Sequence, residues 1–244
     1  DKTTTGLMVA VDATCSGLQI LAGLAKDRST AELVNVVPSS KPSDAYKAVA
    51  DKAKEFLPSY MHHWMDRSVC KRTVMTIPYN ATKDSSRKYI REALLEKKID
   101  PTKDELTQIV NAVYQSMDSI VPGPMQVMRW IKKHVGLYIR NGAKEVEWVT
   151  PSGFIVNQRR DDIETEQMEL QLLGRTRVRL PTGKTSPSPN KHKSSTAPNY
   201  IHSFDASILH RSFTKFDEPF TVIHDSVLCR AGDMGTLNRL VRET

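Results

Sequence analysis

The sequence predicts an α+β fold in which the two ends of the chain form a small β-containing base and the middle forms a mostly helical lobe. Two short apolar runs, residues 7–11 and 220–223, lie at opposite ends of the chain and have the length of buried strands. Between them, apolar residues recur at helical spacing over several segments. If the terminal strands pair, the middle of the chain is an insertion carried on this base.

The first half of the chain is predicted to form a strand, a tight turn and a series of helices. Small residues over 13–17 suit the turn, and the helix after it has its apolar positions at Leu18, Leu21, Ala22 and Ala25. The next helix opens at 42–43 and ends at Pro58, with one face made of Ala45, Val49, Ala53 and Phe56. Longer helical patterns cover 84–97, 104–118 and 124–141, and Gly142 follows the last of them, where a glycine commonly ends a helix.

The second half is predicted to contain a hairpin, a loop and a last strand. The runs 146–149 and 154–156 flank the turn residues Pro151-Ser152-Gly153. The segment 181–198 is rich in Pro, Ser, Thr and Lys, which indicates a mobile surface loop. The chain starts with Asp1 and stops after the helix-like run 238–242, so we expect it to be an internal piece of a longer protein.

The composition favours a polyanionic partner. The 244 residues carry a formal charge of +7, with a pI of about 9.3, which makes nucleic acid the first candidate. No apolar stretch approaches the ~20 residues of a membrane span, so no membrane partner is expected. The three cysteines are widely spaced, which fits neither a disulfide framework nor a zinc site and indicates a reducing compartment.

Two aspartates stand at matching points after the two terminal apolar runs. Asp12 follows the first run, and Asp225 follows the second within His224-Asp225-Ser226. Carboxylates on neighbouring strands are hard oxygen ligands for a pair of magnesium ions, which can clamp the oxygens of a phosphoryl transfer. Taken alone, an Asp after a strand is more commonly a turn or helix-cap residue.

A second candidate group lies between residues 67 and 80. Arg67, Lys71, Met75 and Tyr79 follow one another at steps of four, so on a helix they form one stripe, and Pro78 would end or kink that helix. The cations suit a triphosphate and the ring suits a sugar or base. The alternative is an amphipathic helix with solvated cations and Tyr79 in the core.

A third cluster covers residues 197–207. Its His202 is a candidate to contact a substrate hydroxyl, and a structural histidine with satisfied hydrogen bonds is the alternative. The cluster lies shortly before Asp225 in the sequence.

Together these segments resemble the single-subunit DNA-dependent RNA polymerases of podophages, mitochondria and plastids. The run Asp12-Ala13-Thr14-Cys15-Ser16-Gly17 is similar to the family's first catalytic motif. Residues 67–80 are similar to its second motif, Arg-x-x-x-Lys-x-x-x-x-x-x-x-Tyr-Gly, and His224-Asp225-Ser226 to its third. Residues 148–154 and 197–205 match further family blocks, in the family's order.

The resemblance implies a right-hand polymerase fold that makes RNA on a DNA template. The palm would comprise 1–28 and 203–244, with the fingers at 29–202. Asp12 and Asp225 would bind two Mg²⁺ ions, which assist attack of the RNA 3′-hydroxyl on the α-phosphate of a nucleoside triphosphate. We expect the enzyme to act as a monomer in the cytoplasm of an infected bacterium, because its inserts are short, or else in a mitochondrial matrix or plastid.

The resemblance also assigns the residues that would contact the substrate. Arg67 and Lys71 would grip the incoming triphosphate, and Lys71 would be the candidate to protonate the leaving group. Tyr79 would lie against the sugar and, with His202, would select ribose over deoxyribose. The remaining matches are Gly17, which would permit close backbone approach next to Asp12, and Tyr46.

Two family glycines are replaced in this chain, by Ala13 and by Asn80. Asn tolerates positive φ better than other non-glycine residues, so a turn at 80 is still expected. The segment 98–123 does not align clearly with the family.

Three other functions compete with this one. A family A DNA polymerase shares the fold, but its first motif usually has Tyr after the Asp and its third resembles His-Asp-Glu, whereas this chain has Ala13 and Ser226. The chain could also be a basic nucleic-acid-binding module without catalysis, but the presence of all the candidate site residues would then be a coincidence. A metal-dependent nuclease usually gathers more carboxylates than the two found here.

Overall fold

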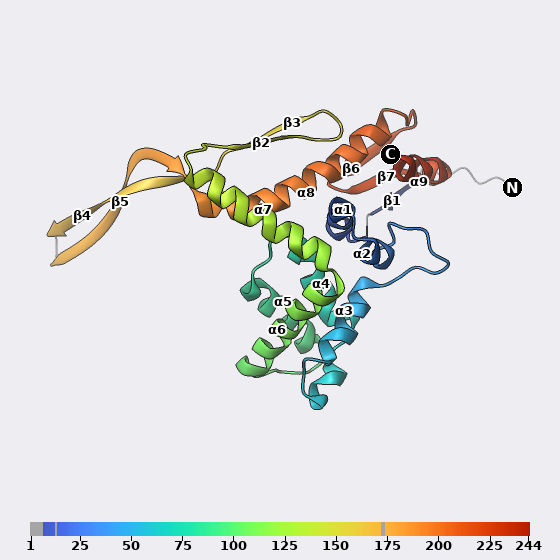
Figure 1. The fold of residues 1–244 in the computed structure, drawn as a ribbon, viewed down its shortest axis with the longest axis horizontal. Helices are drawn as coiled ribbons and strands as arrows, with labels where there is room; N and C mark the ends of the chain where they lie inside the picture. The colour runs from blue at the N-terminus through green and yellow to red at the C-terminus, as the bar shows by residue number, and fades with distance from the viewer. Residues whose placement is uncertain (1–6, 13, 172–173) are drawn as a thin grey trace.

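A small antiparallel sheet joins the two ends of the chain. The computed structural model describes residues 7–12, 14–171 and 174–244, and Ala13 therefore lies outside the described residues. Strands β1 (Met8–Val11), β6 (Phe220–Ile223) and β7 (Ser226–Arg230) form a sheet of order β1-β7-β6. The predicted α+β fold, with its ends paired and its middle mostly helical, is confirmed (Figure 1).

Two details of the predicted base are wrong. The strand that pairs with β1 is β7, which was not predicted, and β6 lies on the far side of it. The side chains of β1 and β6 are exposed rather than buried, because the small core beside the sheet takes its residues from β7, from helix α9 (Met234–Glu243) and from the connection before β6. The buried residues of this core are Phe216, Val227, Cys229 and Leu237.

The helical lobe contains most of the buried apolar side chains. Its helices are α1 (Ser16–Ala25), α2 (Arg28–Leu33), α3 (Ala45–Lys54), α4 (Arg67–Thr76), α5 (Lys83–Glu96), α6 (Lys103–Ile120) and α7 (Pro122–Arg140), with 3-10 turns η1 (Ser59–Trp64) and η2 (Ile77–Tyr79). Aspartate or threonine side chains cap the first turns of α3 to α6, which is why each helix begins where it does. Among the described residues, no helix is both long and apolar enough to span a membrane.

The predicted helices agree with this lobe except that α3 is shorter than the helix predicted between residues 42 and 58. Helices α5, α6 and α7 lie on the patterns 84–97, 104–118 and 124–141, and Gly142 follows α7 with a φ of 97°. Ala45, Val49 and Ala53 are buried on α3, as expected. Phe56 is 44% exposed, because α3 ends at Lys54 and the chain has left the helical course before residue 56.

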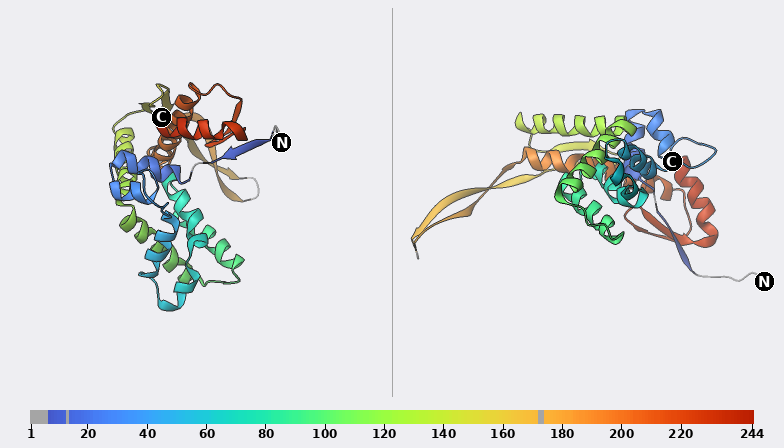
Figure 2. Two further views of the ribbon diagram at one scale, coloured as in Figure 1. Left: turned by 90° about the vertical axis from the view of Figure 1, so that its right-hand side faces the viewer. Right: turned by 90° about the horizontal axis from the view of Figure 1, so that it is seen from below.

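Two hairpins and one long helix complete the chain. Strands β2 (Val146–Val149) and β3 (Ile155–Gln158) form the predicted hairpin. Strands β4 (Asp161–Gln171) and β5 (Arg175–Pro187) form a second, longer hairpin that projects away from the body (Figures 1 and 2). Helix α8 (Pro189–Phe213) returns from the base of this hairpin to the sheet.

The predicted loop at 181–198 is therefore wrong. Its first part pairs with β4 as the end of β5, and its second part is the start of α8. The polar residues mark the junction instead, since the Ser188 side chain accepts from the backbone N–H of Lys191 and Pro189 occupies the first turn. Ser188 and Pro189 are helix-start signals rather than loop signals.

Helices α1, α7 and α8 pack against one another and bring distant parts of the chain to one place. A small core of Leu21, Met128 and Ile201 holds them, with Tyr79 against it. The start of α1, the end of η2 and the middle of α8 therefore meet beside the sheet.

Candidate active site

The two candidate metal ligands lie at the same end of the sheet. The antiparallel register pairs Val11 with Val227, so Asp12, the next residue, lies level with Ser226 and beside Asp225. The Ser226 hydroxyl donates to the Val11 carbonyl at 3.4 Å across this junction. Asp225 stands in the two-residue turn between β6 and β7, in which His224 has a φ of 58°. Both carboxylates are exposed.

This pair of carboxylates suits magnesium by its chemistry. Mg²⁺ is commonly held by one or two carboxylates, with substrate phosphates and water at its other positions. Among the described residues, no group of three or more His, Cys, Asp or Glu side chains could hold a metal ion by itself. The donor set at Asp12 and Asp225 is thus of the kind that shares its ion with a phosphorylated substrate.

Arg67 is held at the start of α4 by two contacts with the start of α3. Its Nε donates to Asp44 Oδ2 at 2.7 Å, and its guanidinium lies over the Tyr46 ring at 5.3 Å from the centroid. Partial burial alone would raise the pKa of Asp44, but hydrogen bonds from the Lys47 N–H and the Arg67 guanidinium hold that pKa below its usual value. The bond to Asp44 uses only Nε, so the Nη groups of Arg67 remain as donors for another partner.

The predicted stripe on α4 is present up to its end. Lys71 lies one turn beyond Arg67, and both are exposed, as is Met75. Among the described residues, Lys71 has no ion-pair partner. The α-helix gives way to the 3-10 turn η2 at Ile77, as Pro78 predicted, and this places Tyr79 beyond Met75, at the opposite end of the stripe from its cations. Asn80 has a φ of 66°, so the expected turn survives without glycine.

Tyr79 and His202 form the centre of the site. Their rings stack with centroids 4.6 Å apart and an interplanar angle of 15°. Burial lowers the pKa of His202, although the nearby charge of Asp225 opposes this. Burial likewise raises the pKa of Tyr79, so its hydroxyl is a neutral hydrogen-bonding group near pH 7.

Gly17 provides the close approach that was predicted for it, but toward Tyr79. A β-carbon on Gly17 would lie 3.1 Å from both Cζ and the hydroxyl oxygen of Tyr79, and 3.0 Å from Cβ of Pro78. A side chain at position 17 would therefore displace the ring that stacks on His202.

Two further residues of the site, Ser16 and Asp205, were not predicted as site residues. The Ser16 hydroxyl lies 3.1 Å from the Tyr79 hydroxyl and donates to Asp205 Oδ2 at 3.4 Å. Burial raises the pKa of Asp205 to about 6, with the bond from Ser16 lowering it and the charge of Asp225 raising it. Asp205 stands three residues after His202, so helical spacing could have placed it on the same side of α8.

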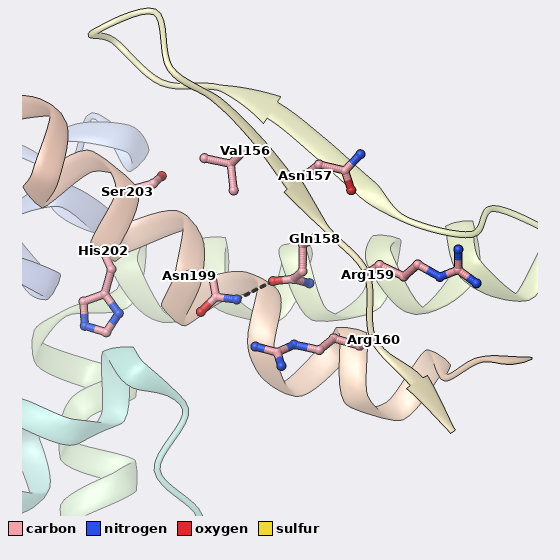
Figure 3. A pocket seen from close by; sticks show the side chains of 8 residues that line it. All are labelled: Val156, Asn157, Gln158, Arg159, Arg160, Asn199, His202 and Ser203. Carbon is pink, nitrogen blue, oxygen red and sulfur yellow. Dashed lines mark hydrogen bonds between the residues drawn. The ribbon is translucent and has the colours of Figure 1, made fainter. Parts of the chain in front are cut away.

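An open pocket of about 390 Å³ extends from His202 toward the base of the long hairpin (Figure 3). Arg159 and Arg160 line its far end, and Asn199 donates from Nδ2 to Gln158 Oε1 at 2.6 Å across its floor. The pocket therefore adds a polar, cationic surface on one side of the Tyr79–His202 stack.

Comparisons with known proteins show the family of the chain. A family model described as DNA-dependent RNA polymerase matches residues 1–244. The mitochondrial DNA-directed RNA polymerase of Mus musculus is 29% identical over 255 residues, covering 97% of this chain and 21% of the relative. The DNA-directed RNA polymerase of Enterobacteria phage K11 is 27% identical over 304 residues, covering 98% of this chain and 33% of the relative.

A solved structure is also similar to this chain. It is the POL domain of Pol1 from M. smegmatis in complex with DNA primer-template and dNTP, with a TM-score of 0.49 and 18% identity over 97% of this chain and 35% of that one. The chain spans about a fifth to a third of the length of the two polymerase relatives.

Proposed function

The chain belongs to the DNA-dependent RNA polymerase family, and from that premise we propose that it carries the nucleotidyl-transfer site of an enzyme that makes RNA on a DNA template. The observation that carries the proposal is the meeting of three distant segments. Gly17, Tyr79 and His202 come together beside Asp225, whose charge reaches both rings. A coincidental set of residues would have no reason to converge in this way.

Asp12 and Asp225 are the residues that would hold two magnesium ions, by their carboxylate oxygens and their place at one end of the sheet. Bound magnesium supplies Lewis-acid activation of the RNA 3′-hydroxyl and neutralises charge on the departing pyrophosphate. The exposure of both carboxylates leaves them accessible to a phosphorylated substrate.

Arg67 and Lys71 are proposed to bind the triphosphate. Asp44 and Tyr46 fix the Arg67 guanidinium, which leaves its outer nitrogens to donate to phosphate oxygens. Lys71, one turn further along α4, carries an exposed ammonium that can give a proton to the pyrophosphate oxygen as its bond to the α-phosphate breaks.

Tyr79 and His202 are proposed to face the ribose and to distinguish it from deoxyribose. The stack fixes the plane of both rings, and Gly17 leaves room for the phenol. A hydroxyl held in a fixed place rejects a sugar that lacks its partner, because the site's polar group is then left unpaired.

The same proposal assigns residues 1–28 and 203–244 to a palm and 29–202 to fingers, with the second boundary inside α8. Its partners are a DNA template, an RNA product and nucleoside triphosphates, and the enzyme is proposed to act as a monomer. The place of action is a phage-infected bacterium or an organelle. The alignments extend over 304 residues with the phage K11 enzyme and 255 with the mouse mitochondrial enzyme, so short inserts do not favour a phage.

The test is extension of an RNA primer on a DNA template, with magnesium, by the full-length protein that contains this chain. We expect ribonucleotides to be incorporated in preference to deoxyribonucleotides, and Asp225→Ala to abolish extension. Asp217→Ala is the matched control, because Asp217 is an exposed carboxylate shortly before the same hairpin. Extension by Asp225→Ala at the wild-type rate contradicts the proposal, and a preference for deoxyribonucleotides indicates a DNA polymerase.

A further inference from the structure

Three side chains from three separate elements form a chain of hydrogen bonds at the centre of the site. Ser16 is the first residue of α1, Tyr79 ends η2, and Asp205 lies in α8. The Ser16 hydroxyl is 3.1 Å from the Tyr79 hydroxyl and 3.4 Å from Asp205 Oδ2. Ser16 is buried, with 8% of its surface exposed, so its hydroxyl depends on these protein partners.

The number of protons on these groups determines which group donates in each of these hydrogen bonds. A serine hydroxyl has one proton to donate and two lone pairs that accept, and an ionised carboxylate can only accept. The Ser16 proton therefore goes to Asp205, and the bond between Ser16 and Tyr79 must be donated by Tyr79. The Tyr79 proton thus points at Ser16. The phenol oxygen also accepts from the backbone N–H of Gly17, which leaves it one further lone pair for another donor.

Contacts on two sides restrict movement of the Tyr79 ring. The His202 ring stacks on it and the Gly17 backbone lies against its hydroxyl end. The position of its proton is then the main remaining variable, and Ser16 determines it.

We propose that Ser16 and Asp205 are positioning residues that turn the Tyr79 hydroxyl into a hydrogen-bond acceptor for the 2′-hydroxyl of an incoming ribonucleotide. This inference rests on the proposed function. A ribose 2′-hydroxyl donates to the second lone pair of the Tyr79 oxygen, whereas a deoxyribose leaves that lone pair without a donor. Without Ser16, the Tyr79 proton turns freely, and the acceptor direction is no longer enforced.

The experiment measures kcat/KM for a ribonucleotide and for the matching deoxyribonucleotide in primer extension by the full-length protein. The quantity of interest is their ratio in the wild type, Ser16→Ala, Tyr79→Phe and the double variant. We expect Ser16→Ala to lower the ratio by about fivefold, which is the effect of one neutral hydrogen bond. The double variant should have the ratio of Tyr79→Phe alone, because Ser16 acts through the phenol hydroxyl.

Ser86→Ala is the matched control. Ser86 is fully buried and its hydroxyl lies 3.1 Å from the Tyr114 hydroxyl, so it loses the same kind of bond inside the helical lobe. We expect its ratio to equal that of the wild type. A general loss of stability would lower both rates together and leave the ratio unchanged, so the ratio separates positioning from packing.

Asp205→Asn gives an independent measurement if Ser16→Ala folds poorly. An amide presents a donor as well as an acceptor, so it no longer dictates the direction of the Ser16 proton. A lowered ratio supports the inference. If the wild type is active and prefers ribonucleotides, an unchanged ratio in both Ser16→Ala and Asp205→Asn overturns it. The inference is also overturned if the double variant lowers the ratio by the combined effect of Ser16→Ala and Tyr79→Phe. A wild-type protein that extends no primer overturns the proposed function as well.

Discussion

Asn80 donates from its side-chain Nδ2 to the backbone carbonyl of Ser194, at 2.9 Å, and so ties the turn after η2 to helix α8. This carbonyl lies four residues before Pro198, which has no N–H to complete the helical bond. The asparagine that stands in place of a family glycine therefore satisfies an acceptor that the proline leaves open. It does so from a left-handed backbone conformation, with a φ of 66°.

Two substitutions at position 80 separate these roles. Asn80→Gly keeps the backbone conformation and loses the hydrogen bond, so we expect it to lower the free energy of unfolding by about 1 kcal/mol. Asn80→Ala also strains the backbone, so we expect a loss of roughly 2 kcal/mol. Chemical denaturation of both variants is the measurement, and equal losses would show that the left-handed conformation costs alanine nothing here.

Gly17→Ala should disturb the centre of the site. Its methyl group would meet the Tyr79 hydroxyl end at 3.1 Å, so the ring must shift on His202. We expect kcat/KM for ribonucleotides to fall by about tenfold or more, because small displacements at a reacting centre are costly. Gly23→Ala, in the same helix, meets nothing within 4 Å and should be slightly stabilising. Wild-type activity in Gly17→Ala would contradict the contact.

Asp44→Asn should weaken triphosphate binding without unfolding α3. Asparagine caps a helix about as well as aspartate, so only the ion pair with Arg67 is lost. We expect KM for the nucleotide to rise by roughly threefold, as for a partly exposed ion pair, with little change in Tm. The control is Asp66→Asn, which removes the cap charge of the next helix and its pair with Lys97 instead. An equal rise in both variants would rule out a specific effect through Arg67.

The raised pKa of Asp205 predicts a pH dependence of stability. Its folded-state pKa, about 6, lies above the usual value of 3.8, so the folded protein binds this proton more tightly than the unfolded chain does. Stability from this group is therefore present below about pH 4 and is lost as pH rises through 6. The difference in unfolding free energy between wild type and Asp205→Asn, measured from pH 4 to 7, should change in that direction. A difference that does not vary with pH would contradict the shift.

The sequence predicted what local periodicity determines and missed what distant contacts determine. Helices α5 to α7 have long apolar stripes, and side chains cap the starts of α5 and α6, so the sequence pattern predicts all three. The strand β7 and the start of α8 were missed because short or polar-rich segments look like loops until a partner pairs with them. Ser16 and Asp205 lie 189 residues apart, and no local pattern could have joined them.

Helix α8 connects the long hairpin, the site residues and the sheet through one continuous helix. Its 25 residues span about 37 Å at a rise of 1.5 Å per residue, and it runs from the root of the projecting hairpin to the edge of the sheet. His202 and Asp205 stand on it less than one turn apart, so neither can move without the other. A substitution that tilts this helix would therefore move the two site residues, the hairpin and the packing against the sheet together. Evolution of any one of these properties is thereby constrained by the other two.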